Sequence, residues 1–316
     1  MLKVLELFGG IGACSRALDN LGIPYELADY VDNDKYAVKS FNAIHHTDYN
    51  PQDIRLWDKS LEVDLIMHGS PCQDFSIAGK QKGGDEDSGT RSSLMYETIR
   101  IVEKIRPKYV IWENVRNLLG DKHIHNFRAY LAKMEELGYT NYYKVLNAKD
   151  YGVPQHRERI FTVSTLGGSF TFPVSSSTIV LNDILEDADP RFYCTESQIN
   201  TMKKPLKHYD YVGRECVRLG GLYDGATKHQ AGSIYDPRGL SPTLSTMQGG
   251  NQEPIILADK LRRLTPHECW RLMGFDDEAF AAAQSVCSNS QLYKQAGNSI
   301  VVPVLEAILK ELLHAD

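Results

Sequence analysis

The 316-residue chain lacks the features that mark several special classes of protein. No apolar run approaches the roughly 20 residues of a membrane span, and charge interrupts the apolar start too early for a signal peptide. Its six cysteines show no Cys-x-x-Cys spacing, which disfavours both a zinc site and a disulfide framework. We therefore expect a cytoplasmic protein with mostly reduced thiols and no bound metal.

Basic residues are in the minority, because 35 Lys and Arg stand against 41 Asp and Glu. The deficit is uneven: residues 203–238 hold seven Lys or Arg and four Asp or Glu, a local charge of +3 in a chain of net charge -6. A basic segment in an acidic chain suits a protein that meets phosphate groups. A basic surface loop without a partner would give the same count.

Apolar runs alternate with helix-like stretches through the first half of the chain. The runs lie at 2–7, 25–31, 63–67, 109–112, 142–146 and 160–165, and the helix-like stretches at 13–21, 34–44, 94–105 and 124–137. This alternation predicts an α/β fold with a mostly parallel sheet.

The pattern changes after about residue 166. Short β-like pieces separated by Gly, Pro and Ser predict a small irregular domain at 175–258. Helical spacing returns at 265–273, with Thr265 as the N-cap and Pro266 in the first turn. A last helix is predicted from near Ser299 to Leu313.

A lone cysteine and an acid each follow a buried apolar run. Cys72 comes after the run 63–67, and Glu113 ends the run 109–112. Because parallel strands end at one edge of a sheet, both side chains are expected to face one crevice. A free cysteine is more often a buried structural thiol, but the Ser-Pro-Cys-Gln setting favours a nucleophile.

A glycine-rich turn, Phe8 to Gly12, separates the first apolar run from the first helix-like stretch. Glycines let a backbone pass close to a ligand, and the helix that follows offers free N–H groups. Asp32 is placed to bind ribose hydroxyls, and Asp53 with Ile54 could meet an adenine edge. These features indicate an adenosine-bearing cofactor. A dinucleotide site is the obvious rival, although its third glycine is missing, and a tight turn without a ligand stays open.

Two arginines, Arg157 and Arg159, come just before the run 160–165. Alternate residues of a strand share a face, so the two guanidinium groups could converge on one polar site. A solvent-facing edge strand would show the same alternation.

The thiol and the acid together suit chemistry at carbon 5 of cytosine. That carbon is a poor nucleophile until a thiolate adds at carbon 6. A carboxylic acid beside ring nitrogen 3 stabilises the charge that develops there, and the apolar strand is expected to keep Glu113 partly protonated. One arginine could polarise the pyrimidine oxygen and support Glu113.

With these motifs in order, the chain resembles the DNA (cytosine-5)-methyltransferases of bacteria and their phages. The resemblance covers essentially the whole length, and its six motifs stand in the family's linear order: Phe8-Gly9-Gly10-Ile11-Gly12, Gly69-Ser70-Pro71-Cys72-Gln73, Glu113-Asn114-Val115, Gln155-His156-Arg157-Glu158-Arg159, Arg263-Leu264-Thr265-Pro266-His267-Glu268 and Gly297-Asn298-Ser299.

The resemblance implies a Rossmann-like catalytic and cofactor-binding domain in 1–174, a target-recognition domain in 175–258 and C-terminal helices in 259–316 that return to the catalytic domain. It implies S-adenosylmethionine as cofactor and, as substrate, a cytosine flipped out of double-stranded DNA into a cleft between the domains. The partners it implies are duplex DNA and, for a member of a restriction-modification system, a cognate restriction endonuclease. We expect a monomer.

The same resemblance implies residue roles. Cys72 would be the nucleophile, Glu113 the group at nitrogen 3, and Arg157 and Arg159 the base-binding arginines. The cofactor site would be lined by Phe8, Gly10, Ile11, Gly12, Asp32, Asp53, Ile54, Pro71, Leu94, Asn298 and Ser299. DNA contacts are expected from Gln73, Ser76, Arg238, Thr243 and Leu244.

One position departs from some relatives, which carry a Trp stacked on adenine where this chain has Asn33. Adenine is then expected to find apolar cover at Phe8 and Ile54. The alternatives are a tRNA cytosine-5 methyltransferase with the same motifs, a catalytically silent DNA-binding homologue, and a nicotinamide oxidoreductase that rests on the glycine turn alone. Methylation of exocyclic amines is disfavoured, because the chain has no Asp/Asn/Ser-Pro-Pro-aromatic motif.

Overall fold

The computed structural model describes residues 1–71, 94–223, 231–250 and 252–314. The chain forms two compact units, the first made of Met1–Leu146, Glu158–Val174 and Val304–Asp316, the second of Asn147–Arg157 and Ser175–Pro303. One of the four places where the chain passes between the units follows Val174, and residues 259–303 lie in the second unit. The functional names of the domains stay a prediction.

The first unit is built on a six-stranded sheet of order β2-β1-β3-β4-β6-β5. Strands β1 to β4 are parallel neighbours, and β6 runs antiparallel to β4. The prediction of a mostly parallel α/β sheet is therefore confirmed. The strands are β1 (Leu2–Leu7), β2 (Tyr25–Val31), β3 (Leu65–His68), β4 (Tyr109–Val115), β5 (Thr140–Asn147) and β6 (Glu158–Thr165).

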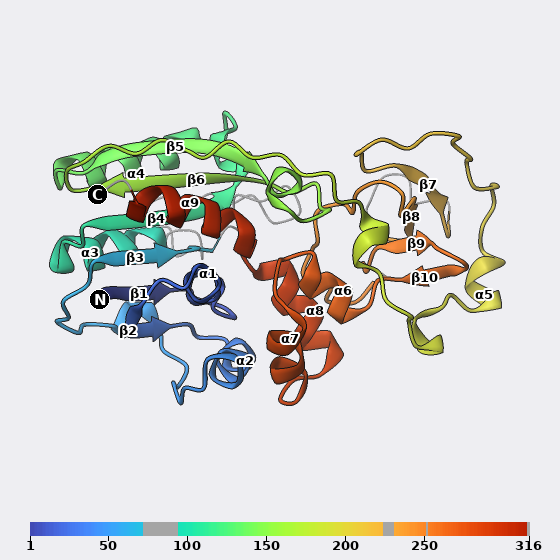
Figure 1. Ribbon diagram of the computed structural model, residues 1–316, viewed down its shortest axis with the longest axis horizontal. Helices are drawn as coiled ribbons and strands as arrows, with labels where there is room; N and C mark the ends of the chain where they lie inside the picture. Colours follow the sequence, from blue (N-terminus) through green and yellow to red (C-terminus); the bar gives the residue numbers. More distant parts are fainter. Residues whose placement is uncertain (72–93, 224–230, 251, 315–316) are drawn as a thin grey trace. The chain divides into compact units, whose positions relative to one another are not determined.

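Helices cover this sheet, and Figure 1 shows α9 in front of it with α3 and α4 behind. Local signals explain where they begin: the Asp34 side chain accepts the Tyr36 N–H at 2.9 Å to cap α2. Gly22, in the left-handed region at φ 64°, ends α1. The helices are α1 (Ala13–Leu21), α2 (Lys35–His45), α3 (Met95–Ile105), α4 (Ile124–Glu136) and α9 (Val302–His314), with 3-10 turns at η1 (Ile54–Leu56) and η3 (Arg116–Leu119).

The register of the parallel strands decides where the loops meet. Leu7 of β1 pairs with His68 of β3, and His68 pairs with Trp112 of β4. The carboxyl ends of these strands therefore lie side by side, as open α/β sheets arrange their ligand sites. A buried apolar cluster that includes Leu5, Val110 and Trp112 holds the strands and helices together.

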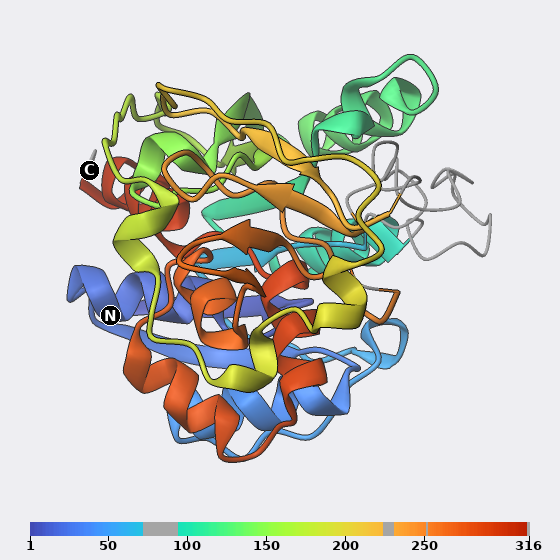
Figure 2. The same cartoon turned by 90° about the vertical axis from the view of Figure 1, so that its right-hand side faces the viewer.

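The second unit contains a four-stranded sheet of order β10-β9-β8-β7, seen in gold and orange in Figure 2. Thr265, Pro266 and Glu268 cap α6 through a capping box, as the sequence predicted. The helix expected from Ser299 begins instead at Val302. The elements are β7 (Arg218–Gly221), β8 (Ser233–Tyr235), β9 (Ile255–Leu257), β10 (Leu261–Arg263), α5 (Glu196–Ile199), α6 (Pro266–Arg271), α7 (Asp277–Gln284), α8 (Asn289–Asn298), η4 (Ala148–Tyr151), η5 (Leu181–Ile184) and η6 (Pro190–Phe192).

Across the described ranges, no helix combines the length and the apolar character that a membrane crossing needs. The same ranges hold no group of three or more His, Cys, Asp or Glu side chains suited to a metal ion.

Candidate active site

The glycine turn after β1 has a backbone that few side chains tolerate. Phe8 has φ 54°, and Gly10 and Gly12 have φ 58° and 83°. A bulky non-glycine residue in the left-handed region is an uncommon, strained conformation that tends to occur at functional sites. A Cβ added at Gly10 would meet no atom within 4 Å, so the turn opens onto free space there. A Cβ at Gly12 would collide with the side chain of His45.

Asp32 holds this turn in place. Its carboxylate accepts the Gly10 N–H at 2.9 Å and the Asp34 N–H at 2.8 Å. The Tyr30 hydroxyl donates to the Gly10 carbonyl at 2.6 Å. These bonds tie the end of β2 to the glycine turn, and the role of Asp32 toward ribose hydroxyls stays a prediction.

Two of the predicted adenine contacts are engaged elsewhere. The Asp53 carboxylate caps η1 and pairs with Arg55 at 2.5 Å, and this guanidinium lowers the pKa of Asp53. Ile54 is 4% exposed and belongs to the apolar core. Phe8 and Leu94 are partly buried against the same core. Their roles toward a cofactor stay predictions, and Phe8 has more free surface than Ile54 to cover an adenine.

The predicted nucleophile, Cys72, follows four residues after the end of β3 at His68. Cys72, Gln73 and Ser76 lie outside the described residues. The preceding residues are described, and the Asn114 side-chain amide donates to the Ser70 carbonyl at 3.4 Å. Ser70 and Pro71 are therefore held next to the end of β4, which carries Glu113.

Glu113 faces Arg159 across two antiparallel strands. The Arg159 Nε lies 3.1 Å from the Glu113 Oε1, and their side chains are 16% and 12% exposed. Val115 pairs with Arg159, which places the guanidinium diagonally across from Glu113. This contact fixes the two side chains relative to each other, and the partly protonated state expected of Glu113 stays a prediction.

Arg157 does not share a strand face with Arg159, because β6 begins at Glu158. Its guanidinium is buried in the second unit and donates to three backbone carbonyls, those of Leu244 at 3.2 Å, Gly297 at 3.1 Å and Ser299 at 2.9 Å. The expected convergence of the two arginines on one polar site stays a prediction. The base-binding role of Arg157 stays a prediction.

The Thr243-Leu244 element rests on the segment that precedes Arg157. Gln155 accepts the Leu244 N–H at 3.0 Å and donates to the Leu272 carbonyl at 2.9 Å. The Thr243 hydroxyl donates to the His156 carbonyl at 2.6 Å. Leu244 is 2% exposed, so its side chain supports the element from inside.

The Gly297-Asn298-Ser299 motif lies at the C-terminal end of α8, where Ser299 is the C-cap. A Cβ at Gly297 would collide with the backbone carbonyl of Ser245, so only glycine fits this approach. Asn298 is exposed and Ser299 is 7% exposed. Segments 155–157, 243–245 and 297–299 thus meet in the second unit.

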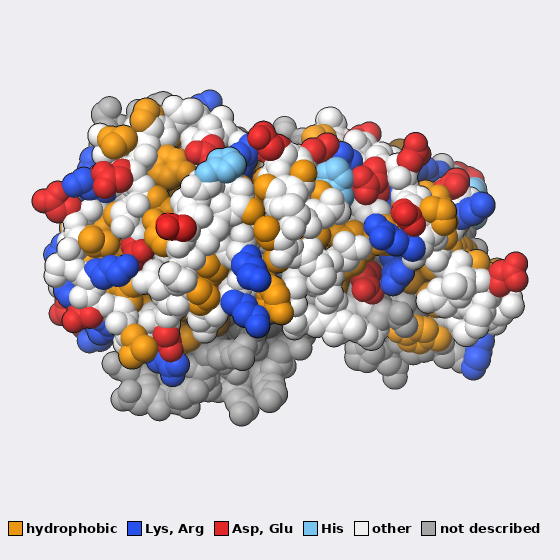
Figure 3. Space-filling view, turned by 90° about the horizontal axis from the view of Figure 1, so that it is seen from below, with side chains coloured by type: hydrophobic (Ala, Val, Ile, Leu, Met, Phe, Trp, Pro, Cys, Tyr) orange, Lys and Arg blue, Asp and Glu red, His pale blue; other side chains and the backbone are white. Residues whose placement is uncertain are grey.

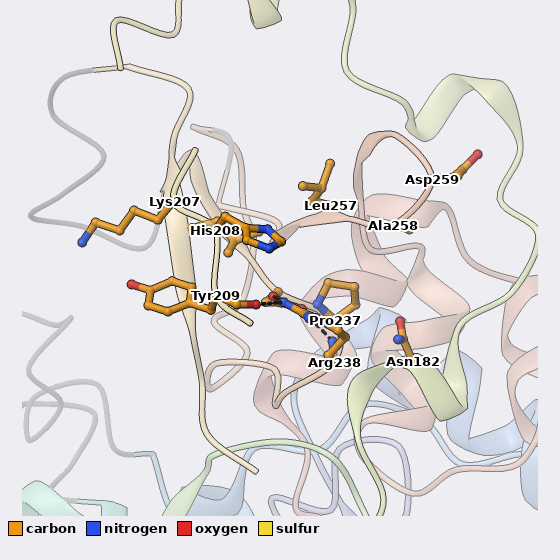
Figure 4. A pocket seen from close by; sticks show the side chains of 11 residues that line it. Asn182, Lys207, His208, Tyr209, Pro237, Arg238, Leu257, Ala258 and Asp259 are labelled. Atoms are coloured by element: carbon orange, nitrogen blue, oxygen red, sulfur yellow. Dashed lines mark hydrogen bonds and ion pairs between the residues drawn. The ribbon is translucent and has the colours of Figure 1, made fainter. Parts of the chain in front are cut away.

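A hollow of about 460 Å³ lies on the second unit and includes Arg238 in its wall. Figure 4 shows His208, Pro237 and Arg238 at its centre, with the Lys207 ammonium extending away. The Arg238 guanidinium pairs with Asp236 at 2.7 Å and donates to the Tyr209 carbonyl at 2.8 Å. It is therefore pre-set in orientation while its side chain stays 44% exposed. On the face shown in Figure 3, the described acidic and basic side chains are interspersed.

Sequence reasoning missed several residues that build these sites. Gln155 belongs to the Gln155–Arg159 motif, but sequence reasoning assigned it no role of its own. Its hydrogen bonds to Leu244 and Leu272 join segments that are distant along the chain. Ser70 and Asn114 also stood beside the catalytic candidates without a role. A small polar residue next to each strand end was the available signal.

Comparisons with known proteins agree with this geometry. The family model described as C-5 cytosine-specific DNA methylase matches residues 2–314. The chain is 35% identical to the type II methyltransferase M2.ScrFI of Lactococcus lactis subsp. cremoris over 100% of both chains. It is 32% identical to the type II methyltransferase M.HhaI of Haemophilus parahaemolyticus, over 97% of this chain and 93% of that protein.

One solved structure shows the same fold at low identity. The S. pombe Dnmt2 methyltransferase superposes with a TM-score of 0.74 at 21% identity, over 99% of each chain.

Proposed function

This chain belongs to the C-5 cytosine-specific DNA methylases, which are S-adenosylmethionine-dependent methyltransferases, and from that premise we propose how its own residues perform the reaction. We propose that Cys72 attacks a cytosine flipped out of duplex DNA while Glu113 and Arg159 bind its ring. The observation that carries the proposal is the Glu113–Arg159 pair at 3.1 Å, at the end of the strand next to the one that leads to Cys72.

The covalent step starts from the Cys72 thiolate. Its sulfur bonds to carbon 6, and the electron pair of the 5,6 double bond becomes available at carbon 5. When bound, S-adenosylmethionine would supply the methyl group: its sulfur–methyl bond would break as carbon 5 takes the methyl up, and S-adenosylhomocysteine would leave. Loss of the carbon 5 proton to water then re-forms the double bond and expels the thiolate, which restores the enzyme.

Glu113 and Arg159 act on the ring during this addition. Negative charge develops at ring nitrogen 3 and the neighbouring oxygen when sulfur adds at carbon 6. A protonated Glu113 carboxyl can donate to nitrogen 3, while the guanidinium of Arg159 stabilises charge on the oxygen. The 3.1 Å contact fixes the two groups relative to each other before substrate binds. Both side chains are largely buried, so water competes little for them.

The first unit has a turn that fits an adenosine-bearing methyl donor. The open space over Gly10, the N-terminus of α1 that follows, and the Asp32 carboxylate that fixes the turn would form a cradle for a ribose. Phe8 and Pro71 are partly exposed beside the same strand ends. These residues would hold the cofactor, and Asn298 and Ser299 are proposed as further contacts from the second unit.

We assign Arg157 a positioning role, which revises its expected contact with the base. Its three carbonyl partners belong to the Thr243-Leu244 element and to the Gly297-Asn298-Ser299 motif. One side chain thus fixes both a DNA-contacting element and a cofactor-contacting motif.

Arg238, whose guanidinium is held by Asp236, is proposed to contact DNA. The variant Arg238→Ala should therefore weaken DNA binding more at low salt than at high salt. An equal loss of binding at both salt concentrations would contradict this contact.

Duplex DNA is the proposed partner, joined by a restriction endonuclease if the chain serves restriction-modification, and the enzyme is proposed to act as a cytoplasmic monomer. The similarity to type II methyltransferases supports duplex DNA as the partner. Size-exclusion chromatography at working concentration tests the oligomeric state, since a dimer peak would overturn it.

Bisulphite mapping of duplex DNA treated with the purified protein and S-adenosylmethionine tests the function. We expect protected cytosines in one short sequence context. Cys72→Ser should abolish protection while cofactor affinity stays within about two-fold, because the serine hydroxyl is a far weaker nucleophile than a thiolate. Continued turnover by this variant would rule out the covalent route, and protection only of tRNA would favour the RNA alternative.

A further inference from the structure

A buried hydrogen bond joins the strand that leads to the nucleophile with the strand that carries the acid. The indole Nε1–H of Trp112 donates to the Ser70 hydroxyl at 2.9 Å. Trp112 is 1% exposed and Ser70 is 3% exposed. Ser70 stands two residues before Cys72, and Trp112 directly precedes Glu113.

The indole is held on several sides, so it cannot turn to follow Ser70. The ring of Tyr130 lies 4.1 Å from it between centroids, and the ring of His68 lies 5.7 Å away at an interplanar angle of 8°. His68 Nε2 is in turn 3.2 Å from the Tyr130 hydroxyl. The three rings come from β3, β4 and α4 of the first unit, and all of them are buried.

The peptide of Ser70 is fixed as well as its side chain. The Asn114 amide donates to the Ser70 carbonyl at 3.4 Å, on the other side of Glu113 in sequence. Trp112 and Asn114 thus bind Ser70 from the positions immediately before and after Glu113. A misplacement of roughly 1 Å between reacting groups can cost on the order of 100-fold in rate, so such a clamp bears on catalysis.

We propose that Ser70 and Trp112 form a positioning pair that sets where the chain delivers Cys72 relative to Glu113. The pair touches no reacting atom. It acts by fixing Ser70. Cys72 is two residues further along the chain, and each residue moves the chain by at most about 3.8 Å. This inference rests on the proposed role of Cys72 as the nucleophile.

The alternative is a purely structural role, in which the Trp112–Ser70 hydrogen bond only satisfies two buried polar groups. Ser164 offers a matched control for it. This serine is fully buried in β6 of the same unit, and its hydroxyl donates to the Asn141 side chain at 2.6 Å. Ser164 pairs with Val110, five residues before Val115 at the end of β4, so its loss should affect stability without affecting Cys72.

The experiment measures single-turnover methyl transfer and covalent trapping on DNA that carries 5-fluorocytosine. Fluorine cannot leave carbon 5 as a proton does, so the Cys72 adduct cannot be eliminated once carbon 5 has taken up the methyl group. The rate at which this adduct accumulates therefore reports sulfur attack and methyl transfer together. The proteins are the wild type, Ser70→Ala, Ser70→Thr, Trp112→Phe and Ser164→Ala. Cofactor affinity and the KM for DNA are measured for each.

We expect Ser70→Ala and Trp112→Phe to slow adduct formation and kcat by about 10- to 100-fold, with cofactor affinity and KM within about two-fold. Ser70→Thr, which keeps the hydroxyl, should recover most of the rate. A double variant that combines Ser70→Ala and Trp112→Phe should be no slower than the slower of the two single variants, because both substitutions remove the same hydrogen bond. Ser164→Ala should trap at the wild-type rate.

A rate for Ser70→Ala within two-fold of the wild type overturns the positioning pair, as does an equal slowing in Ser164→Ala. These outcomes leave the proposed function intact, since the wild type still forms the adduct. A wild type that methylates but forms no adduct overturns the covalent mechanism, and the positioning pair with it.

Discussion

At the scale of single residues, the two arginines of one motif have different partners. Arg159 pairs with Glu113 at 3.1 Å, whereas Arg157 binds three carbonyls of the second unit. The difference arises because one residue lies inside β6 and the other before it. Two identical side chains, two positions apart, therefore serve different structures.

Glu113→Gln should lower kcat by about 100- to 10,000-fold, because the amide cannot supply a proton at ring nitrogen 3. The acid acts mainly in the transition state, so the KM for DNA should change little. Glu158→Gln is the matched control, since this carboxylate of β6 pairs at 2.6 Å with Arg116 of η3. Steady-state kinetics of both variants decide the matter, and a near-normal kcat for Glu113→Gln would remove this residue from its role.

Arg157→Lys should destabilise the second unit by about 1–3 kcal/mol, because an ammonium cannot reproduce the fork and leaves buried carbonyls unpaired. Cofactor affinity should fall as well, since Ser299 and Gly297 lose their common partner. Urea unfolding and calorimetric titration with S-adenosylmethionine measure the two effects. Unchanged values in both would show that the guanidinium does not position these segments.

At the scale of elements, helix caps show how local sequence sets structure. Thr265 accepts the Glu268 N–H at 3.1 Å and donates to Glu186 at 2.5 Å, at the start of α6. Ser288 holds the same position in α8 but makes no side-chain capping bond. The two residues therefore form a natural pair for comparison.

Thr265→Ala should cost about 1–2 kcal/mol of the free energy of unfolding, because it removes the cap and one partner of Glu186. Ser288→Ala should cost less than about 0.5 kcal/mol, since no capping bond is lost. Urea denaturation followed by circular dichroism gives both values. Equal costs would mean that the capping box contributes nothing beyond the exchange of a polar residue for alanine.

Much of the first unit could be predicted from periodicity. The bounds of β1, β2 and α1 match the expected runs, because apolar spacing and flanking glycines are local signals. The antiparallel direction of β6, and with it the approach of Arg159 to Glu113, depends on a pairing that no local pattern encodes. Helix α8 was missed because Gly297 looks like a helix terminus, whereas it is required by the backbone of Ser245.

At the scale of the whole molecule, a buried histidine links stability to pH. Burial lowers the pKa of His68 to about 3 from its ordinary 6.5. Below pH 6.5 the unfolded chain takes up a proton at this residue while the folded chain does not. Stability therefore falls as the pH drops from 6.5 toward 3, by up to about 1.4 kcal/mol per pH unit.

His68→Gln should remove this contribution, so the variant should lose about 2 kcal/mol less than the wild type between pH 6.5 and pH 5.0. His208→Gln is the control, because that side chain is 84% exposed. Urea unfolding of the three proteins at both pH values measures the difference. Parallel pH dependence in the wild type and His68→Gln would contradict a neutral buried imidazole.

The two units are interleaved along the chain, since it passes between them after residues 146, 157, 174 and 303. A hybrid enzyme made by exchanging residues 175–258 alone would cut β9 from β10, which are antiparallel partners at Leu257 and Leu261. It would also replace Leu244, whose backbone N–H donates to Gln155 and whose carbonyl accepts from Arg157. Exchange of residues 175–258 as one block should therefore disturb the second unit more than changes confined to its loops.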